Sequence, residues 1–126
     1  MEAVAAKPET TGKFTWTITN FSSLNTRKQY SEIFHVGGCK WRMLIFPNGN
    51  KVDHLSVYLD VADSVSLPYG WSRSAQFSLT VINHLNSANN FTKATQHQFN
   101  VRQSDWGFTS LMPLKELYDL SRGYLV

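Results

Sequence analysis

Few residues of this sequence have the types and the spacing that enzyme chemistry needs. Cys39 is the only cysteine, and it opens a predicted strand directly after Gly37-Gly38. A thiol nucleophile paired with a histidine usually sits at a helix start or a cationic site, so Cys39 is better interpreted as a small buried hydrophobic residue. The four histidines are dispersed: His35, His54, His84 and His97. No pair has metal-ligand spacing, and neither a phosphate loop nor a nucleophile elbow is present. The sequence predicts no catalytic residue, metal site or cofactor.

The richest cluster of functional groups is Ser104-Asp105-Trp106-Gly107-Phe108. It combines an acid, two aromatic side chains and a glycine, between a long alternating stretch and a predicted helix start. Such a cluster can turn the chain and pack, with Gly107 supplying backbone freedom. It can also present an indole and a carboxylate to a ligand at a sheet edge. Residue types alone leave both interpretations open.

The elements that must position this cluster are predicted from alternating apolar and polar residues. The predicted strands span residues 13–19, 30–36, 39–46, 54–61, 74–83 and 91–102. Pro113–Tyr118 has a proline suited to a first helical turn, and Asn20–Leu24 predicts a further short turn of helix. About six strands with regular turn signals predict an all-β, antiparallel sandwich with one or two short helices.

Length and composition limit the remaining classes. The chain has 126 residues, of which 42% are hydrophobic and 17% charged, as in a single globular domain. The formal charge of +3 is spread along the chain without a basic run, so neither nucleic acid nor a membrane is a predicted partner. Residues 1–12 are predicted to be a disordered leader. A single cysteine fits a reducing compartment, so the predicted location is the cytoplasm, the nucleus or both.

Several polar or aromatic side chains fall on faces that the alternation leaves outside the core: Tyr58, Gln96 and Gln98. If the strands that carry them are neighbours, these side chains line one shallow groove with Trp106 and Phe108, and Asp105 adds a carboxylate. Such a groove suits an extended peptide that pairs with a strand edge. In the alternative interpretation, Trp106 and Phe108 close the sandwich and Tyr58 is an ordinary surface aromatic.

Three motifs in order resemble the meprin and TRAF homology (MATH) domain. They are Lys13–Ser22, with the pattern Lys-Phe-Thr-Trp-x-Ile-x-Asn-Phe-Ser, then Val36-Gly37-Gly38-x-Lys40-Trp41, and then Ser104–Phe108. The match runs from about Lys13 to Val126. Residues 44–47, 59–62, 67–72 and 96–99 are especially similar to the N-terminal MATH domain of plant ubiquitin-specific proteases, which are related to the herpesvirus-associated ubiquitin-specific protease of animals.

The resemblance implies a TRAF-like sandwich that binds short peptides, often of the type Pro/Ala-x-x-Ser. It implies that the ligand adds as a strand beside Thr95–Phe99 and that Trp106 packs on a small apolar ligand residue. By the same resemblance, Asp105 accepts a hydrogen bond from the ligand serine, Tyr58 is a groove aromatic and Phe108 supports the wall. This chain departs from the family pattern at three places in the implied site. Asn48 stands where the animal protease has an arginine, relatives have an arginine near Lys93, and Gln98 stands where some relatives have an aromatic residue. The expected peptide-binding set is Asp105, Trp106, Gly107, Phe108, Tyr58, Gln96, Gln98, Lys93 and Asn48.

The family usually continues past residue 126 into one more strand. A domain over residues 13–126 is therefore expected to lack that strand, which either lies in sequence not given or leaves an open edge where a homo-oligomer could form.

The expected function is a non-catalytic adaptor that binds short serine-containing motifs of other proteins and recruits partners or substrates in the ubiquitin pathway. An alternative is the substrate-targeting part of a deubiquitinating cysteine protease whose catalytic domain is outside this chain. A second alternative is an oligomerisation module, although no heptad run is present.

Overall fold

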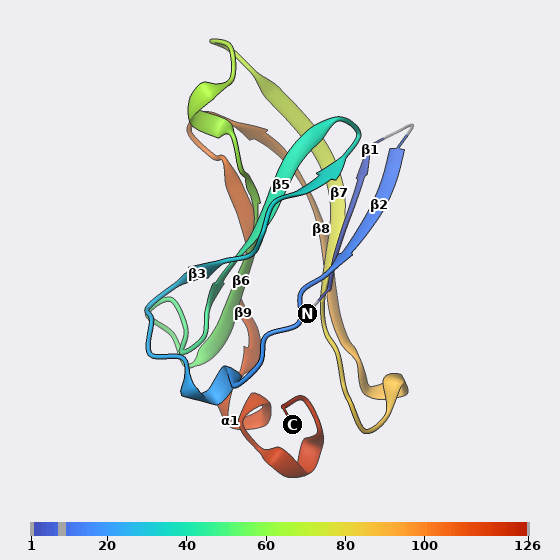
Figure 1. Cartoon of the computed structure of the whole chain (residues 1–126), viewed down its shortest axis with the longest axis vertical. Helices are drawn as coiled ribbons and strands as arrows, with labels where there is room; N and C mark the ends of the chain where they lie inside the picture. Colours follow the sequence, from blue (N-terminus) through green and yellow to red (C-terminus); the bar gives the residue numbers. More distant parts are fainter. Residues whose placement is uncertain (1, 8–9, 126) are drawn as a thin grey trace.

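The computed structural model is a sandwich of two antiparallel sheets, described for residues 2–7 and 10–125, with side chains from residue 11 onward (Figure 1). Sheet A has the order β2-β1-β7-β8, and sheet B has the order β3-β5-β6-β9 with β4 pairing to β5. Sheet A contains β1 (Glu2–Lys7), β2 (Thr10–Thr15), β7 (Ser72–Val81) and β8 (Phe91–Asn100). Sheet B contains β3 (Gln29–Tyr30), β4 (Phe34–Val36), β5 (Cys39–Phe46), β6 (His54–Val61) and β9 (Asp105–Pro113).

In the part of the chain that the structure describes, helical structure is confined to short segments. The α-helix α1 spans Leu114–Leu117, and four 3₁₀ turns span Phe21–Ser23, Ser64–Ser66, Ser87–Asn89 and Leu120–Arg122. The predicted class, an all-β antiparallel sandwich with short helices, is confirmed. A helix of four residues is too short to be stable alone, so α1 depends on the packing of Leu117, which is buried in the core.

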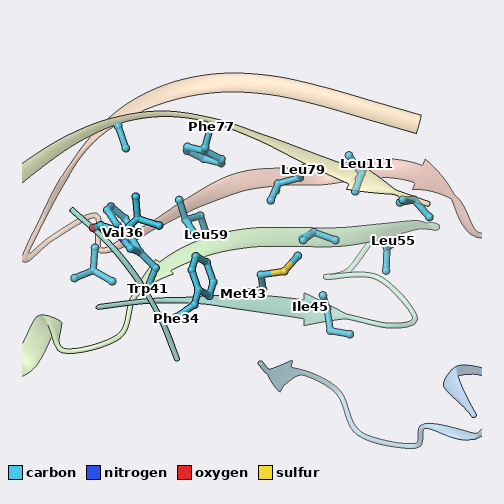
Figure 2. Close-up of a cluster of buried hydrophobic side chains, with 14 of the residues drawn as sticks. Phe34, Val36, Trp41, Met43, Ile45, Leu55, Leu59, Phe77, Leu79 and Leu111 are labelled. Atoms are coloured by element: carbon cyan, nitrogen blue, oxygen red, sulfur yellow. Dashed lines mark hydrogen bonds between the residues drawn. The ribbon is translucent and has the colours of Figure 1, made fainter. Parts of the chain in front are cut away.

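The core fills the space between the sheets (Figure 2). Trp41, Met43 and Leu59 reach it from sheet B, and Phe77 and Phe99 reach it from sheet A. The Trp41 and Phe99 rings meet edge to face across the sandwich, with centroids 5.2 Å apart. Each fully buried side chain of this size contributes about 1.5–3 kcal/mol, so this layer holds the two sheets, and therefore their edges, in a fixed relation.

The two central strands of sheet B have the predicted bounds. β5 and β6 cover residues 39–46 and 54–61; β5 alternates buried residues with others along its first half, whereas β6 is buried except at His54 and Tyr58. The turn before β5 uses Gly37 and Gly38 at φ of 61° and 71°, a conformation that favours glycine. Cys39 follows this turn and is buried, as predicted.

The N-terminal region differs from the prediction of a disordered leader over residues 1–12. Glu2–Lys7 forms β1, which pairs with β2 on one side and β7 on the other and is therefore an interior strand of sheet A. The segment Ala3-Val4-Ala5-Ala6 has no period-two pattern, and alanine has low β-propensity. β1 is held by main-chain pairing with β2 and β7, and a pattern of side-chain types does not reveal such pairing.

Two other predicted strands also change. Residues 30–36 divide into β3 and β4, and the strand predicted over residues 13–19 ends at Thr15, although Ile18 is still half-buried. A cavity of about 430 Å³ lies between residues 15–22, which run on from the end of β2, and the end of β7. Its apolar lining includes Phe21, Val81 and Leu117.

Candidate functional site

The Ser104–Phe108 cluster starts an edge strand, which the sequence did not predict. β9 lies at the end of sheet B, and among the described residues it pairs only with β6. β8 lies at the corresponding end of sheet A, and the turn of residues 101–104 joins the two strands. One side of the sandwich therefore presents two strand edges beside each other.

The main chain of Gly107 faces away from β6. The Val61 N–H donates to the Ser104 carbonyl at 2.9 Å, and the register pairs Leu59 with Trp106 and Tyr58 with Gly107. Hydrogen-bonded and non-bonded pairs alternate in an antiparallel ladder, so the Leu59–Trp106 pair is bonded and the Tyr58–Gly107 pair is not. The N–H and C=O of Gly107 are consequently directed at the free edge of β9.

Trp106 lies at the rim of the inner face of sheet B. It is directly opposite Leu59, a core residue, yet its side chain is 40% exposed. Its indole stacks on the imidazole of His97 from β8, with centroids 4.1 Å apart and planes 3° apart. The structure therefore combines the two interpretations of this residue: Trp106 packs across the side of the sandwich and still presents surface to solvent.

The outer face of sheet B carries a row of charges that ends at Asp105. Asp60 is 5% exposed, forms an ion pair with Arg42 at 2.7 Å and lies directly opposite Asp105. Burial raises the pKa of Asp60, which Arg42 partly offsets. Burial likewise raises the pKa of Asp105, and the charges of Lys28 and His97 act in the opposite direction. Among the described residues no ion pair or hydrogen bond holds the Asp105 carboxylate, so it is an available acceptor.

Tyr58 and Gly107 form the adjoining part of this outer face. The Tyr58 hydroxyl lies 2.7 Å from Thr109 Oγ1 of β9 and accepts from Asn50 Nδ2 at 3.2 Å. Any side chain at position 107 would collide with the Val57 carbonyl oxygen and the Tyr58 Cα. Glycine at this position thus keeps β9 close to β6 and leaves the tyrosine ring without a neighbour on β9 at the paired position.

Phe108 and Lys93 form the continuation of the inner wall. Phe108 is half-buried against the core. The Lys93 ammonium lies 5.7 Å from the Phe108 ring centroid and donates to the Ser110 carbonyl at 2.9 Å. Lys93 therefore links β8 to β9 and keeps a positive charge beside the edge.

Gln96 and Gln98 do not join this site. Both face outward, as predicted, but from sheet A, where Gln96 accepts from Gln76 Nε2 at 3.4 Å and Gln98 donates to Ser72 Oγ at 3.4 Å. β8 does not neighbour β6, so the predicted groove shared with Tyr58 is wrong. Alternation tells which residues of a strand share a face, but not in which sheet the strand lies.

Asn48 is also apart from the cluster. It lies in the turn after β5, where its Oδ1 accepts from the Tyr118 hydroxyl at 3.3 Å. The β5–β6 register places this turn at the Ser56 end of β6, whereas Asp105 pairs at the opposite end.

His97 is the site residue to which sequence reasoning gave no role. Its face was predicted, because it alternates with Phe99, but stacking on Trp106 depends on how the two sheets meet. No group of three or more His, Cys, Asp or Glu residues within the described chain could hold a metal ion. None of the helices in the described part has the length and apolar character that a bilayer-spanning helix requires.

Known proteins are similar to this chain over nearly its whole length, including the candidate site. A family model described as "MATH domain" matches residues 13–126. Ubiquitin C-terminal hydrolase 12 of Arabidopsis thaliana is 67% identical over 126 residues, which is 100% of this chain and 11% of the hydrolase. Ubiquitin C-terminal hydrolase 13 of the same plant is 68% identical over 114 residues, 90% of this chain and 10% of the hydrolase. A MATH domain and coiled-coil domain-containing protein, also from Arabidopsis thaliana, is 55% identical over 116 residues, 90% of this chain and 38% of the relative. The chain thus spans about a tenth of each hydrolase.

Proposed function

This chain belongs to the MATH domain family, and on that premise we propose that it binds short, extended, serine-containing segments of other proteins at the free edge of β9. MATH domains are protein-interaction modules. The predicted resemblance to plant ubiquitin-specific proteases is confirmed by the two hydrolases. The chain is a MATH domain without a hydrolase catalytic domain, so the proposed role is recognition.

The single observation that carries the proposal is the outward main chain of Gly107, which follows two chemically different residues, Asp105 and Trp106, on opposite faces of β9. A ligand strand that pairs with this edge extends sheet B by one strand. Its alternate side chains then face opposite walls. One wall is apolar and contains Trp106 and Phe108, with the Lys93 ammonium at its end. The other contains Asp105 and Tyr58.

The two walls favour different ligand residues. The exposed part of the Trp106 indole suits a small apolar side chain, because a tryptophan at a strand edge offers a large rigid contact surface. An ionised Asp105 is only an acceptor of hydrogen bonds, so its natural partner is a donor such as a serine hydroxyl. A ligand with these two residues close together therefore fits better than one with either alone. A ligand bound at the β9 edge lies on the side where β9 and β8 meet, so it would also run beside Thr95–Phe99.

The cellular role that follows is recruitment. In a protein resembling the ubiquitin C-terminal hydrolases, a peptide-binding domain would bring substrates or partners to a catalytic domain elsewhere. Within the proposal, the domain acts in the cytoplasm, the nucleus or both, because a sequence with a single cysteine fits a reducing compartment.

An array of immobilised decapeptides tests the proposal with the purified domain. Peptides with a central Pro-Ala-Ala-Ser sequence should bind, and replacement of the serine by alanine should weaken them. Absence of binding to every serine-containing peptide would contradict peptide recognition at this edge.

Oligomerisation is the second candidate function, favoured by the two adjacent strand edges of β8 and β9. Light scattering separates the candidates, because a stable trimer in the absence of peptide would favour oligomerisation as the main role. A ubiquitin hydrolysis assay tests the proposal that this chain has no catalytic activity of its own: turnover by this chain that disappears in Cys39→Ala would contradict the assignment of a recognition domain.

A further inference from the structure

The Trp106 indole is held by contacts from the opposite sheet. Its two neighbours in β9, Asp105 and Gly107, face the opposite side of the sheet, so neither supports the indole. Among the described residues, the aromatic ring that packs against it is His97 of β8, stacked with centroids 4.1 Å apart and an interplanar angle of 3°. Near-parallel contact over a whole ring restricts both side-chain torsions of the tryptophan, since rotation about either one breaks the stack.

The imidazole is itself fixed from two directions. It meets the fully buried Phe99 ring edge to face, with centroids 4.7 Å apart and planes at 83°. Its Nε2 lies 3.2 Å from the carbonyl oxygen of Gln103, in the turn that joins β8 to β9. A carbonyl only accepts, so this contact assigns the proton to Nε2. The order of contacts therefore runs from the core through Phe99 and His97 to the exposed indole.

The geometry points to His97 as a positioning residue that fixes the orientation of the Trp106 indole at the β9 edge. This inference rests on the proposed peptide-binding role of Trp106. An indole that is already fixed loses less conformational entropy when a ligand packs on it, so His97 contributes to affinity without touching the ligand. The stack also covers one face of the indole, which leaves the other face and the ring edge for ligand contact.

Three substitutions separate stacking from hydrogen bonding. His97→Phe keeps an aromatic ring and removes the donor, His97→Gln keeps a donor and removes the ring, and His97→Ala removes both. Binding of a fluorescein-labelled decapeptide with a central Pro-Ala-Ala-Ser is measured by anisotropy. We expect His97→Ala and His97→Gln to weaken binding by roughly 3- to 10-fold, the range of an aromatic pair, and His97→Phe to restore most of it. Gln98→Ala, one residue away on the opposite face, is the matched control.

A second readout reports on the indole directly. In protein labelled with 5-fluorotryptophan, the Trp106 resonance is assigned by its absence in Trp106→Phe. Loss of the stacked ring in His97→Ala should shift this resonance towards the value of a solvent-exposed tryptophan, whereas His97→Phe should keep it near the wild-type position. Thermal unfolding of each variant establishes that the comparison concerns folded protein.

The outcomes are distinct. An unchanged Trp106 resonance in His97→Ala, or equal loss of binding in the Phe and Ala variants, would overturn the positioning role. If the wild-type domain bound no peptide, the proposed function would fail, and the fluorine spectra would still decide whether His97 orients the indole.

Discussion

The two strand edges on one side of the sandwich differ in almost every respect. β8 pairs with β7 in an unbroken register of ten residues, and its outward face carries Gln96 and Gln98, which bond to neighbours within sheet A. β9 pairs with β6 in a register that shifts between Leu55 and Val57, and it combines a glycine, an exposed indole and an unpaired carboxylate. The outward glutamines of β8 have hydrogen-bond partners in their own sheet, whereas the start of β9 leaves an indole surface and a carboxylate available. This contrast is the physical basis of the proposal that the ligand binds at β9.

The largest effect is expected from giving β9 the side chain that it lacks. Gly107→Val would force a branched side chain against the Val57 carbonyl and the Tyr58 backbone, with a cost of roughly 3 kcal/mol in the free energy of unfolding. Ala94→Val, on the exposed outer face of β8, should change it by less than about 0.5 kcal/mol. Urea denaturation measures both. Equal free energies of unfolding for the two variants would show that β8 and β9 accept an added side chain equally well, which would contradict the difference between the two strands.

Removal of the indole tests the same contrast in binding. Trp106→Ala should weaken the decapeptide with a central Pro-Ala-Ala-Ser by roughly 2 kcal/mol or more while the fold survives, because the side chain is partly exposed and lies at the rim. Gln98→Ala on β8 should leave the affinity unchanged. Isothermal calorimetry gives the affinities, and circular dichroism monitors the fold. An unfolded Trp106→Ala variant would mean that the indole mainly closes the sandwich.

The carboxylate of Asp105 should discriminate between ligands. Asp105→Ala removes the acceptor and should weaken the serine peptide by about 1 kcal/mol, the usual contribution of one hydrogen bond. The matched peptide with alanine in place of serine should bind both proteins equally. The comparison uses the same calorimetric titrations, and a parallel loss for both peptides would exclude a specific serine contact.

The smallest expected effect is a pH dependence of stability. Burial raises the pKa of Asp105 in the folded state, so the folded state binds this proton more tightly than the unfolded state. The associated stability is present below the ordinary aspartate pKa and is lost as pH rises through the raised value. Asp105 also faces Asp60 across the pair, and like charges at that position cost roughly 0.2–1 kcal/mol.

The uncharged Asp105→Asn variant should therefore be slightly more stable than the wild type at pH 7. The difference should narrow as pH falls through the raised pKa of the wild-type carboxyl, because protonation removes its charge. Urea unfolding at pH 7, 5.5 and 4 measures this trend. A difference that stays constant with pH would show that the Asp105 carboxyl is not destabilised by its surroundings.

The bounds of a strand were predicted correctly where alternating apolar and polar residues end at clear turn signals. β5 and β6 were predicted with their bounds because clean alternation is limited there by Gly37-Gly38 and by the turn after Phe46. β9 was missed as a strand because a glycine among bulky residues also indicates a turn, and because the register shift interrupts the pairing after Phe108. β1 was missed because its pairing depends on the main chains of β2 and β7.

The candidate site was predictable in its residue types but not in its assembly. The motif identified Asp105, Trp106 and Phe108, and alternation placed Tyr58 outside the core. Whether two outward side chains meet depends on strand order, which alternation does not contain. Gln98 was therefore grouped with Tyr58, and the stacking of His97 on Trp106 was not foreseen.

The interior position of β1 has a practical consequence for handling the protein. Glu2 pairs with Thr15 and Thr80, next to the apolar cavity that begins at Thr15 and Val81. An affinity tag or fluorophore attached ahead of Glu2 would thus emerge between two strands and could settle into that hollow. Purification handles and labels meant to leave the β9 edge undisturbed belong elsewhere, and the fully exposed Tyr69 in the loop before β7 offers an attachment point.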